Sequence, residues 1–566
     1  MFAWPILIRK NAKKNLKHFI STKYNCYFVA TKKAFYFMRV LILIILSVLF
    51  ASCAKRGTIT GGVKDSIPPI MKMSEPKNLS TEFKGNKIKL YFDEYIKLKD
   101  INKQLIISPP MKNMPLISPS TPTKNLTITL NDTLTPNTTY SFNFGQSIQD
   151  NNEGNPYQQF KYIFSTGTYI DSLQLVGQIK DAYTKKTDNF VSVMLYERNE
   201  KFYDSIVYKE VPRYITNTLD SLKTFTLENL KAGEYLLVAM KDYNNNNKFD
   251  PKKDKIAFHS EIVTIPDNAA YELELFKEEI PFKTIRPSQA SGNRIILGHE
   301  GKANDVKIEL KNGDEIVPTV VTPFENKDSL QIWFKPIKAD SLSIKVTKNV
   351  MEKEFKLKFN KQKADSLRIN AVQSGVLHLS EKYTLKSSIP ITKIDASKIK
   401  LTNKDSVSVV FTTQYDEPKQ LVVIDFKKEP LERYKFTLEK GAFTDLLERE
   451  SDSLAFTIGT KNVTDYGNLR LHLEGIKSFP IIVELTNAKG DVQASAYSEG
   501  ETTIDFNLLQ PALFTVRIIY DDNKNKVWDT GSYLEKRQTE EVRYFPTEID
   551  VRANWDVDQT LKFSSE

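Results

Sequence analysis

Cysteine and histidine are scarce in this chain of 566 residues, which has two cysteines and five histidines. Two cysteines, Cys26 and Cys53, cannot supply a disulfide framework or a cysteine-rich metal site. The histidines are scattered, without the H-E-x-x-H spacing of zinc proteases, and there is no G-x-S-x-G turn, P-loop or dinucleotide fingerprint. No enzyme motif is therefore recognisable, although abundant Asp and Glu leave a hydrolase with two catalytic carboxylates open as an alternative.

Acidic residues are absent from the first 52 positions, which hold nine of the 80 Lys and Arg. Removing these nine leaves 71 basic residues against 70 acidic ones, so nine of the ten excess positive charges belong to the N-terminal segment. Nucleic-acid binding needs clustered Lys and Arg, because much of its affinity comes from released counterions. The near-neutral remainder predicts no nucleic-acid partner.

A short apolar run indicates an N-terminal targeting segment. Val40 to Phe50 is a run of 11 residues, too short to span a bilayer, which takes about 20 residues. The run ends in Phe50-Ala-Ser-Cys53, which resembles the lipobox of bacterial lipoproteins, although Phe50 stands where that family usually has leucine. The resemblance implies that residues 1–52 are removed, with Met38 as an alternative start. It also implies that Cys53 carries an N-terminal lipid and is anchored to the outer membrane, with its membrane face undetermined.

Apolar and polar side chains alternate repeatedly after residue 70, whereas helical periodicity is almost absent. Leu330, Ile332 and Phe334 form one example, and other segments show the same period of two. Such alternation is typical of half-buried antiparallel strands. Short strands separated by Asn, Asp, Gly and Pro turns predict an all-β chain of tandem sandwiches, each of about 100 residues.

Internal repetition divides the predicted sandwiches further. The pattern around Tyr140 returns around Tyr434, 294 residues later, and the pattern D-x-N-x-N-x-x-x-D at Asp242 returns at Asp521, 279 residues later. A two-domain unit copied once explains both offsets. The prediction is a targeting segment, a lipidated tether and five domains in chain order, with the boundaries 1–52, 53–68, 69–168, 169–277, 278–367, 368–461 and 462–566.

The first predicted domain resembles the bacterial Ig-like domain of the S-layer (SbsA) type. The resemblance rests on the strand Ile88–Phe92, the TTYSF strand Thr138–Phe142, and the turn Ile148-Gln-Asp150. The fourth domain resembles it more loosely, and the second and fifth resemble the transthyretin-like or prealbumin-like β-sandwiches of the same lipoproteins. The resemblance implies a cell-envelope lipoprotein of Ig-like and transthyretin-like domains. It does not specify a function, because such sandwiches have many roles.

Two acidic loops carry the chemistry that the sequence offers. Their spacing matches the first nine positions of an EF-hand loop, which presents alternate oxygen atoms to Ca²⁺. Oxygen ligands of mixed charge suit Ca²⁺ better than Zn²⁺. The predicted ligands are Asp242, Asn244, Asn246, the Lys248 carbonyl and Asp250 in the first loop, and Asp521, Asn523, Asn525, the Val527 carbonyl and Asp529 in the second.

Position 12 departs from the EF-hand, where a glutamate binds calcium through both oxygens. Lys253 stands there in the first loop and Ser532 in the second. Asp254, Glu535 or water would have to replace the glutamate, which predicts weak binding on the order of 10⁻⁴–10⁻³ M. The alternative is a pair of ordinary turns, since Asn and Asp favour turns without any metal.

Aromatic residues flank both loops, and two interpretations of them stay open. Tyr243, Phe249, Trp528 and Tyr533 either pack against the loops, the commoner arrangement, or stack on sugars. The predicted function is a lipid-anchored, non-enzymatic binding or scaffolding protein of the envelope, stabilised by Ca²⁺. Its predicted partner is an unidentified envelope protein or glycan. A carbohydrate-binding surface lipoprotein and a hydrolase are the alternatives.

Overall fold

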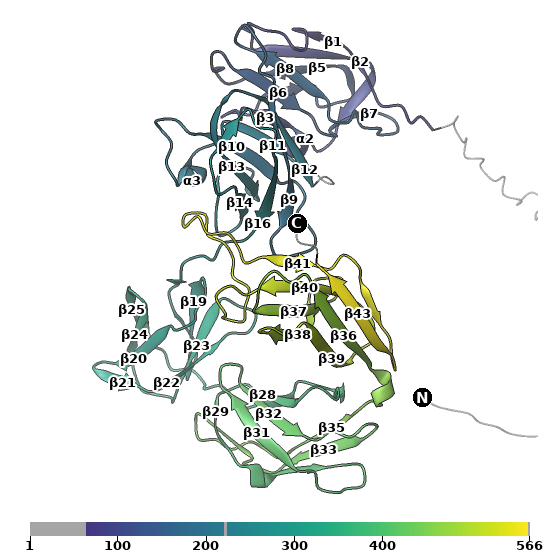
Figure 1. Cartoon of the computed structure of the whole chain (residues 1–566). Helices are drawn as coiled ribbons and strands as arrows, with labels where there is room; N and C mark the ends of the chain where they lie inside the picture. The colour runs from purple at the N-terminus through teal and green to yellow at the C-terminus, as the bar shows by residue number, and fades with distance from the viewer. Residues whose placement is uncertain (1–63, 220–222, 564–566) are drawn as a thin grey trace, which may run out of the picture. The chain divides into compact units, whose positions relative to one another are not determined.

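The computed structural model describes residues 64–219 and 223–563, and it consists of successive β-sheets (Figure 1). The chain divides into two units, Met1–Ile67 and Pro68–Glu566, and the strands below belong to the second. Alternating β-branched and aromatic residues form these strands, and polar turns separate them. The predicted all-β fold of tandem Ig-like sandwiches is confirmed. The apolar run and Cys53 lie outside the described residues.

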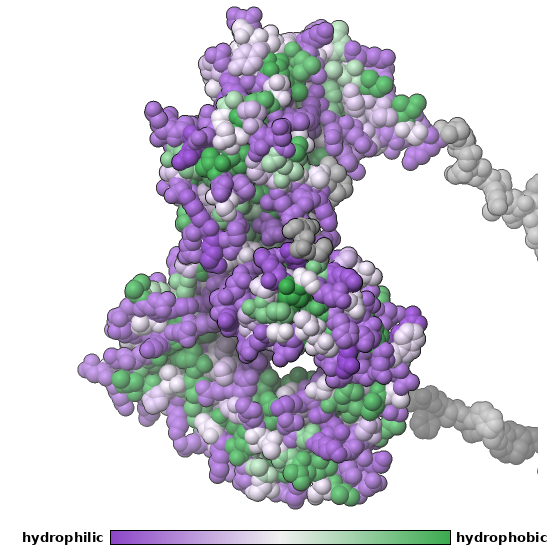
Figure 2. Space-filling view, viewed as in Figure 1, coloured by the Kyte–Doolittle hydropathy of each residue, from purple (hydrophilic) through white to green (hydrophobic). Residues whose placement is uncertain are grey.

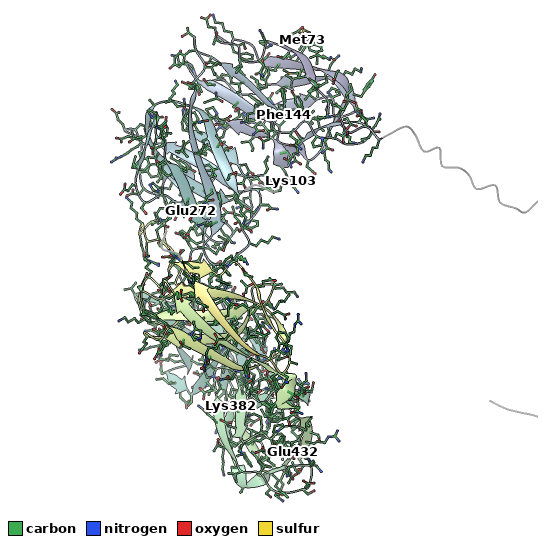
Figure 3. The ribbon with its side chains drawn as sticks, turned by 45° about the vertical axis from the view of Figure 1, so that its right-hand side comes forward. Met73, Lys103, Phe144, Glu272, Lys382 and Glu432 are labelled. Carbon is green, nitrogen blue, oxygen red and sulfur yellow. The ribbon has the colours of Figure 1, made fainter. Side chains whose placement is uncertain are left out.

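The first sandwich packs the sheet β1-β2-β5-β4, with β7 beside β2, against the sheet β3-β6-β8. Phe164 lies in the core between them and contacts the rings of Phe83 and Tyr140. Phe144 is buried in this core, whereas Met73 is exposed (Figure 3). The elements are β1 (Met71–Glu75), β2 (Lys87–Leu98), α2 (Ile101–Gln104), β3 (Ile106–Ser108), β4 (Leu116–Ser118), β5 (Thr123–Thr129), β6 (Thr139–Asn143), β7 (Ile148–Asp150) and β8 (Lys161–Ser165).

The second sandwich opposes the sheet β12-β9-β16, in which β16 runs parallel to β9, to the sheet β11-β10-β13-β14. The short strand β15 also pairs with β13. The elements are β9 (Leu173–Asp181), β10 (Ser192–Glu197), α3 (Ile206–Lys209), β11 (Tyr214–Asn217), β12 (Thr224–Leu230), β13 (Gly233–Lys241), β14 (Lys255–Phe258), β15 (Val263–Ile265) and β16 (Ala270–Leu275).

The third sandwich has the sheets β17-β19-β23-β22, with β18 beside β19, and β21-β20-β24-β25. The predicted alternation is wrong for burial in β23, where Gln331 and Trp333 are buried together with Leu330, Ile332 and Phe334, so this strand is covered on both faces. It holds in β24, where Leu342, Ile344 and Val346 are buried and their neighbours are not. The strands are β17 (Lys283–Thr284), β18 (Ser288–Ser291), β19 (Arg294–Glu300), β20 (Lys307–Asn312), β21 (Glu315–Val317), β22 (Thr319–Pro323), β23 (Ser329–Phe334), β24 (Ser341–Lys348) and β25 (Met351–Lys358).

The fourth sandwich repeats the strand order of the first. Its sheet β26-β28-β32-β31 corresponds to β1-β2-β5-β4, and β30-β33-β35, extended by β27, corresponds to β3-β6-β8. The pair β29–β34 corresponds to the pairing of β2 with β7. The elements are β26 (Ile369–Ala371), β27 (Gly375–Val376), β28 (Tyr383–Ser387), β29 (Ile391–Ile394), η1 (Ala396–Lys398), β30 (Ile399–Thr402), β31 (Phe411–Asp416), β32 (Leu421–Phe426), β33 (Arg433–Leu438), β34 (Phe443–Asp445) and β35 (Leu454–Gly459).

The fifth sandwich repeats the second strand for strand. The sheet β39-β36-β43 again has a parallel last strand, and β38-β37-β40-β41 again carries an extra strand, β42, on β40. The predicted repeat of a two-domain unit is thereby confirmed. The elements are η2 (Val463–Asp465), β36 (Gly467–Glu474), β37 (Ile481–Thr486), β38 (Val492–Ser498), β39 (Thr503–Leu509), β40 (Ala512–Tyr520), β41 (Val542–Tyr544), β42 (Ile549–Val551) and β43 (Asp556–Lys562).

The surface is mostly polar where it is seen. On the face shown in Figure 2, hydrophobic residues form scattered groups among hydrophilic ones. Across residues 64–219 and 223–563, no helix combines the length and the apolar character needed to cross a membrane.

Candidate functional site

The first acidic loop follows strand β13. The Asp242 carboxylate accepts hydrogen bonds from the main-chain N–H groups of Asn244, at 2.9 Å, and Asn247, at 2.7 Å. The side-chain oxygen of Asn246 accepts another from the N–H of Lys248 at 2.9 Å. The side chains of positions 1 and 5 thus hold the main chain of the loop in a tight turn.

The second acidic loop follows the equivalent strand, β40. The Asp521 carboxylate accepts hydrogen bonds from the N–H groups of Asn525, at 3.1 Å, and Lys526, at 2.9 Å. Asn523 accepts one from Asn525 at 3.0 Å, and Asn525 accepts one from Val527 at 2.9 Å. In both loops, therefore, the N–H of position 6 donates to the side chain of position 1, and the N–H of position 7 donates to the side chain of position 5.

The backbone of the two loops is also alike. Positions 4 and 6 are left-handed in both, with φ of 53° and 56° at Asn245 and Asn247 and of 63° and 66° at Lys524 and Lys526. The EF-hand has an invariant glycine at position 6 for the same sharp turn. Left-handed backbone is unfavourable for lysine, so its recurrence indicates that the surrounding loop imposes it.

Three of the four predicted side-chain ligands of the second loop lie in direct contact. The Asp529 carboxylate accepts hydrogen bonds from the side-chain amides of Asn523, at 2.5 Å, and Asn525, at 2.6 Å. The fourth, Asp521, is fully buried at the start of the loop. The structure therefore brings the predicted ligands of this loop together.

The first loop differs at its C-terminal end. The Asp250 carboxylate accepts a hydrogen bond from the N–H of Lys252 at 3.0 Å, and the ammonium group of Lys253 donates to the side-chain oxygen of Asn244 at 3.2 Å. Lys253 occupies position 12. A positive charge thus stands at the first loop where the EF-hand has a ligand.

A buried carboxylate from outside the nine positions completes each loop. Asp254 accepts hydrogen bonds from the N–H groups of Tyr243, at 2.9 Å, and Asp250, at 2.8 Å. In the second loop, Glu540 accepts hydrogen bonds from the N–H groups of the same two positions, Asp522 and Asp529, both at 2.9 Å. Glu535, which the sequence suggested for this role, pairs instead with an arginine two residues later. Glu540 was missed because it follows the loop by 11 residues and no spacing rule points to it.

Burial and neighbouring acidic groups raise the pKa of one carboxyl group at each loop. Burial, followed by the charge of Asp254, raises the pKa of Asp242. Burial, followed by the charges of Asp529 and Asp521, raises the pKa of Glu540. In the part of the chain that the structure describes, no group of three His, Cys, Asp or Glu side chains is arranged as a metal site. A cation in these loops would therefore depend on asparagine and main-chain oxygens as well.

Most of the flanking aromatic residues pack against protein. Phe249 and Tyr533 are buried, and Trp528 is half-buried with its ring centre 4.6 Å from that of Tyr183. Of the four, Tyr243 is exposed, at 55%. The packing interpretation accounts for three of these side chains, which leaves the sugar-stacking alternative with a single ring.

One histidine has a suggestive pair of neighbours. His472 lies 3.2 Å from the Thr503 hydroxyl through Nδ1 and 3.0 Å from the Asp558 carboxylate through Nε2. The three residues come from the adjacent strands β39, β36 and β43: Thr503 is the register partner of His472, and Asp558 lies diagonally, two residues from its partner on β43. The neighbouring depression, of about 300 Å³, is lined by Asp558 but not by the other two. The arrangement is that of a polar ladder across a sheet.

Comparisons with known proteins assign part of the chain to a family. Residues 65–166 match the bacterial Ig-like domain. This match covers the first sandwich and agrees with its two-sheet architecture. The first sandwich thus belongs to an Ig-like fold, which does not by itself specify a function. None of the curated proteins matches the chain.

Similar solved structures include an S-layer protein, rSbsC(31-844), at 10% identity and a TM-score of 0.14, with 79% of this chain and 65% of that chain covered. The eight N-terminal Ig domains of the Down syndrome cell adhesion molecule match at 8% and 0.14, with 70% and 49% covered. The Bacillus anthracis TIE protein matches at 12% and 0.13, with 88% and 76% covered. This chain thus spans less than two thirds of the length of the first two proteins. TM-scores this low carry no argument about how its domains are arranged.

Proposed function

We propose that this chain is a lipid-anchored, non-enzymatic binding or scaffolding protein of the bacterial envelope whose repeated sandwiches are stabilised by Ca²⁺. One observation supports the calcium component above all. Two loops at equivalent strand ends, 279 residues apart, share the same backbone turn and the same hydrogen bonds from position 6 to 1 and from position 7 to 5. Ordinary turns do not need to repeat a nine-residue pattern of oxygen-bearing side chains.

The residues of the loops suit a hard cation. Asp242, Asn244, Asn246 and Asp250, with the Lys248 carbonyl, would hold one Ca²⁺; Asp521, Asn523, Asn525 and Asp529, with the Val527 carbonyl, would hold the other. A bound Ca²⁺ supplies positive charge that offsets the repulsion between buried carboxylates. The second loop is the better candidate, since Lys253 places an ammonium group at the first.

The anchor and the domain division belong to the same proposal. Cys53 would carry the lipid, and residues 53–68 would tether the sandwiches to the outer membrane. Five hydrophobic clusters, each between the two sheets of one sandwich, support domains at 69–168, 169–277, 278–367, 368–461 and 462–566. The second and fifth domains share one strand order and are assigned to the same type, which their sequences suggest is transthyretin-like.

Thermal unfolding of the full chain tests the calcium component. At a Ca²⁺ concentration ten times Kd, each site adds about 1.4 kcal/mol, which raises the Tm of a domain of about 100 residues by roughly 4–8 °C. Asp521→Ala should abolish the shift of the fifth sandwich. Asp491→Ala, in an Asn-Asp turn of the same sandwich, is the matched control and should keep it. A Tm that ignores millimolar Ca²⁺ would contradict the proposal.

Fractionation of cells tests the anchor. The wild-type chain should sediment with the outer membrane, and Cys53→Ser should release it into the soluble fraction. Equal membrane association of the two forms would show that Cys53 does not anchor the chain.

A further inference from the structure

The outer face of the sheet β11-β10-β13-β14 is buried, although such a face normally meets water. Leu236, Val238 and Met240 of β13 lie there in a hydrophobic cluster with Phe249 and Tyr533. Tyr533 belongs to the fifth sandwich. This cluster, called the shared core below, therefore joins the second and fifth sandwiches.

Residues 528–538, called the bridging segment below, extend from the second acidic loop into the second sandwich. The Tyr533 hydroxyl donates a hydrogen bond to the carbonyl of Asp204 at 2.8 Å. The hydroxyl of Thr530 donates to the carbonyl of Lys277 at 2.7 Å. Tyr533 is only 6% exposed, so these bonds enclose a buried ring.

A glycine lets the bridging segment approach this closely. A β-carbon on Gly531 would lie 2.7 Å from the ring of Phe276, closer than packed carbon atoms allow. Two residues further on, the N–H of Tyr533 donates to the Glu278 carboxylate at 2.5 Å. The segment therefore fits the second sandwich in shape and is hydrogen-bonded both to it, at Lys277, and to Glu278, the residue that follows it.

Both acidic loops reach this interface through their eighth residue. In the first loop this is Phe249, whose ring centre lies 5.3 Å from Tyr208, which in turn lies 6.1 Å from Tyr533. In the second loop it is Trp528, which contacts Tyr183 of the second sandwich. A change in the conformation of either loop would thus move an aromatic side chain of the same interface.

We infer that the two acidic loops and the bridging segment form a calcium-dependent lock between the second and fifth sandwiches. A cation in one loop fixes the aromatic residue at its eighth position, which stabilises the shared core and thereby strengthens cation binding in the other loop. The inference rests on the proposed calcium binding. Thermodynamic linkage requires the coupling to be reciprocal, and such couplings typically change an affinity by about 5–150-fold.

Terbium luminescence in the full chain tests this coupling. Tb³⁺ also prefers oxygen ligands, and Trp528 within the second loop can transfer excitation energy to it. Trp528→Phe identifies the emission that comes from this loop, and displacement by Ca²⁺ gives its calcium affinity. Asp242→Ala, which alters only the first loop, should lower that affinity about fivefold or more.

Interface variants complete the test. In a Tyr533→Ala background, Asp242→Ala should no longer change the affinity of the second loop. Tyr183 lies in a half-buried turn, and Tyr183→Ala removes the ring that contacts Trp528. This variant should give the same loss of coupling, and it serves as the test if Tyr533→Ala folds poorly. Tyr169→Ala is the matched control, because this tyrosine is 60% exposed and near the start of the same sandwich.

Two outcomes would overturn parts of the account separately. In one outcome, Ca²⁺ displaces Tb³⁺ from the second loop with the same affinity in the wild-type chain and in Asp242→Ala. That result would overturn the lock and leave calcium binding in place. If there were no Trp528-dependent emission, or if Ca²⁺ could not displace it, calcium binding by the second loop would be contradicted as well.

Discussion

Arg517 of strand β40 donates a hydrogen bond to the hydroxyl of Tyr183 at 2.6 Å, and its guanidinium lies 4.1 Å from the centre of that ring. The arginine is almost fully buried and is neutralised by Glu484 at 2.5 Å. The buried guanidinium thus has its carboxylate partner in the fifth sandwich and its aromatic partner in the second. These contacts fix where the surfaces of the two sandwiches meet.

Arg517→Met is therefore expected to weaken the second and fifth sandwiches together. Removing one member of a buried ion pair costs about 3–5 kcal/mol, because the other charge is left without a partner. Differential scanning calorimetry of the full chain should show a Tm lowered by roughly 10 °C or more for the affected transition. The double variant Arg517→Met with Glu484→Leu removes both charges and should regain much of this loss. If the double variant regained no stability, the loss would come from the contact between Arg517 and Tyr183 more than from the unpaired Glu484 carboxylate.

Lys253→Glu should raise the calcium affinity of the first loop. The change removes the ammonium group that donates to Asn244 and places a carboxylate at position 12, where calcium loops of high affinity have one. A gain of about tenfold or more is expected from calorimetric titration. Lys252→Glu, with the same change of charge one residue earlier, is the control, because Lys252 pairs with Glu300 and not with the loop. Equal gains in both variants would indicate a general charge effect.

Calcium affinity should fall as the solution becomes acidic, and the fall should begin above the usual range for carboxylates. Burial raises the pKa of Asp242, a predicted ligand of the first loop, above the ordinary aspartate value, so this group takes up a proton at a higher pH than in the unfolded chain. Protons compete with the cation for these oxygens. Titrations from pH 7 down to the ordinary range of aspartate, about pH 4, should show weakening affinity and proton release on binding. A constant affinity across this window would contradict the assigned ligands.

The last strands of the first and fourth sandwiches, β8 and β35, should respond differently to loss of a phenylalanine side chain. Phe164 is fully buried and contacts four aromatic rings, so Phe164→Ala should cost about 3–5 kcal/mol. Phe456 of the corresponding strand β35 lies opposite Phe436, in the register position of Tyr162 in the first sandwich; it is only half-buried, so Phe456→Ala should cost less. Hydrogen exchange of the two strands gives each local free energy of opening. Equal losses would contradict the difference in packing.

The architecture was predictable because period-two alternation and turn residues are local signals. Strand β24 alternates as predicted, and the repeats at Tyr140 and Asp242 correspond to repeated strand orders. Strand β13 was harder to predict, since six consecutive residues from Tyr235 to Met240 are buried. Its continuous apolar sequence is the signal of a strand covered on both faces, but it does not say what covers it.

The contacts that complete the candidate site depend on the fold. Glu540 reaches the second loop because β41 pairs with β40, and Tyr533 reaches the shared core because the bridging segment extends between sandwiches. Neither contact follows from spacing along the chain. The proposed ligands within each loop could be named from the sequence because all of them lie within nine residues.

Isothermal titration of the full chain with Ca²⁺ tests the central claim most directly. The account predicts two bound Ca²⁺ per chain, one fewer in Asp242→Ala, one fewer in Asp521→Ala, and none in the double variant, with Asp491→Ala unchanged at two. Heat of binding that is absent from the wild-type chain, or that persists in the double variant, would show that these loops are turns and not calcium sites.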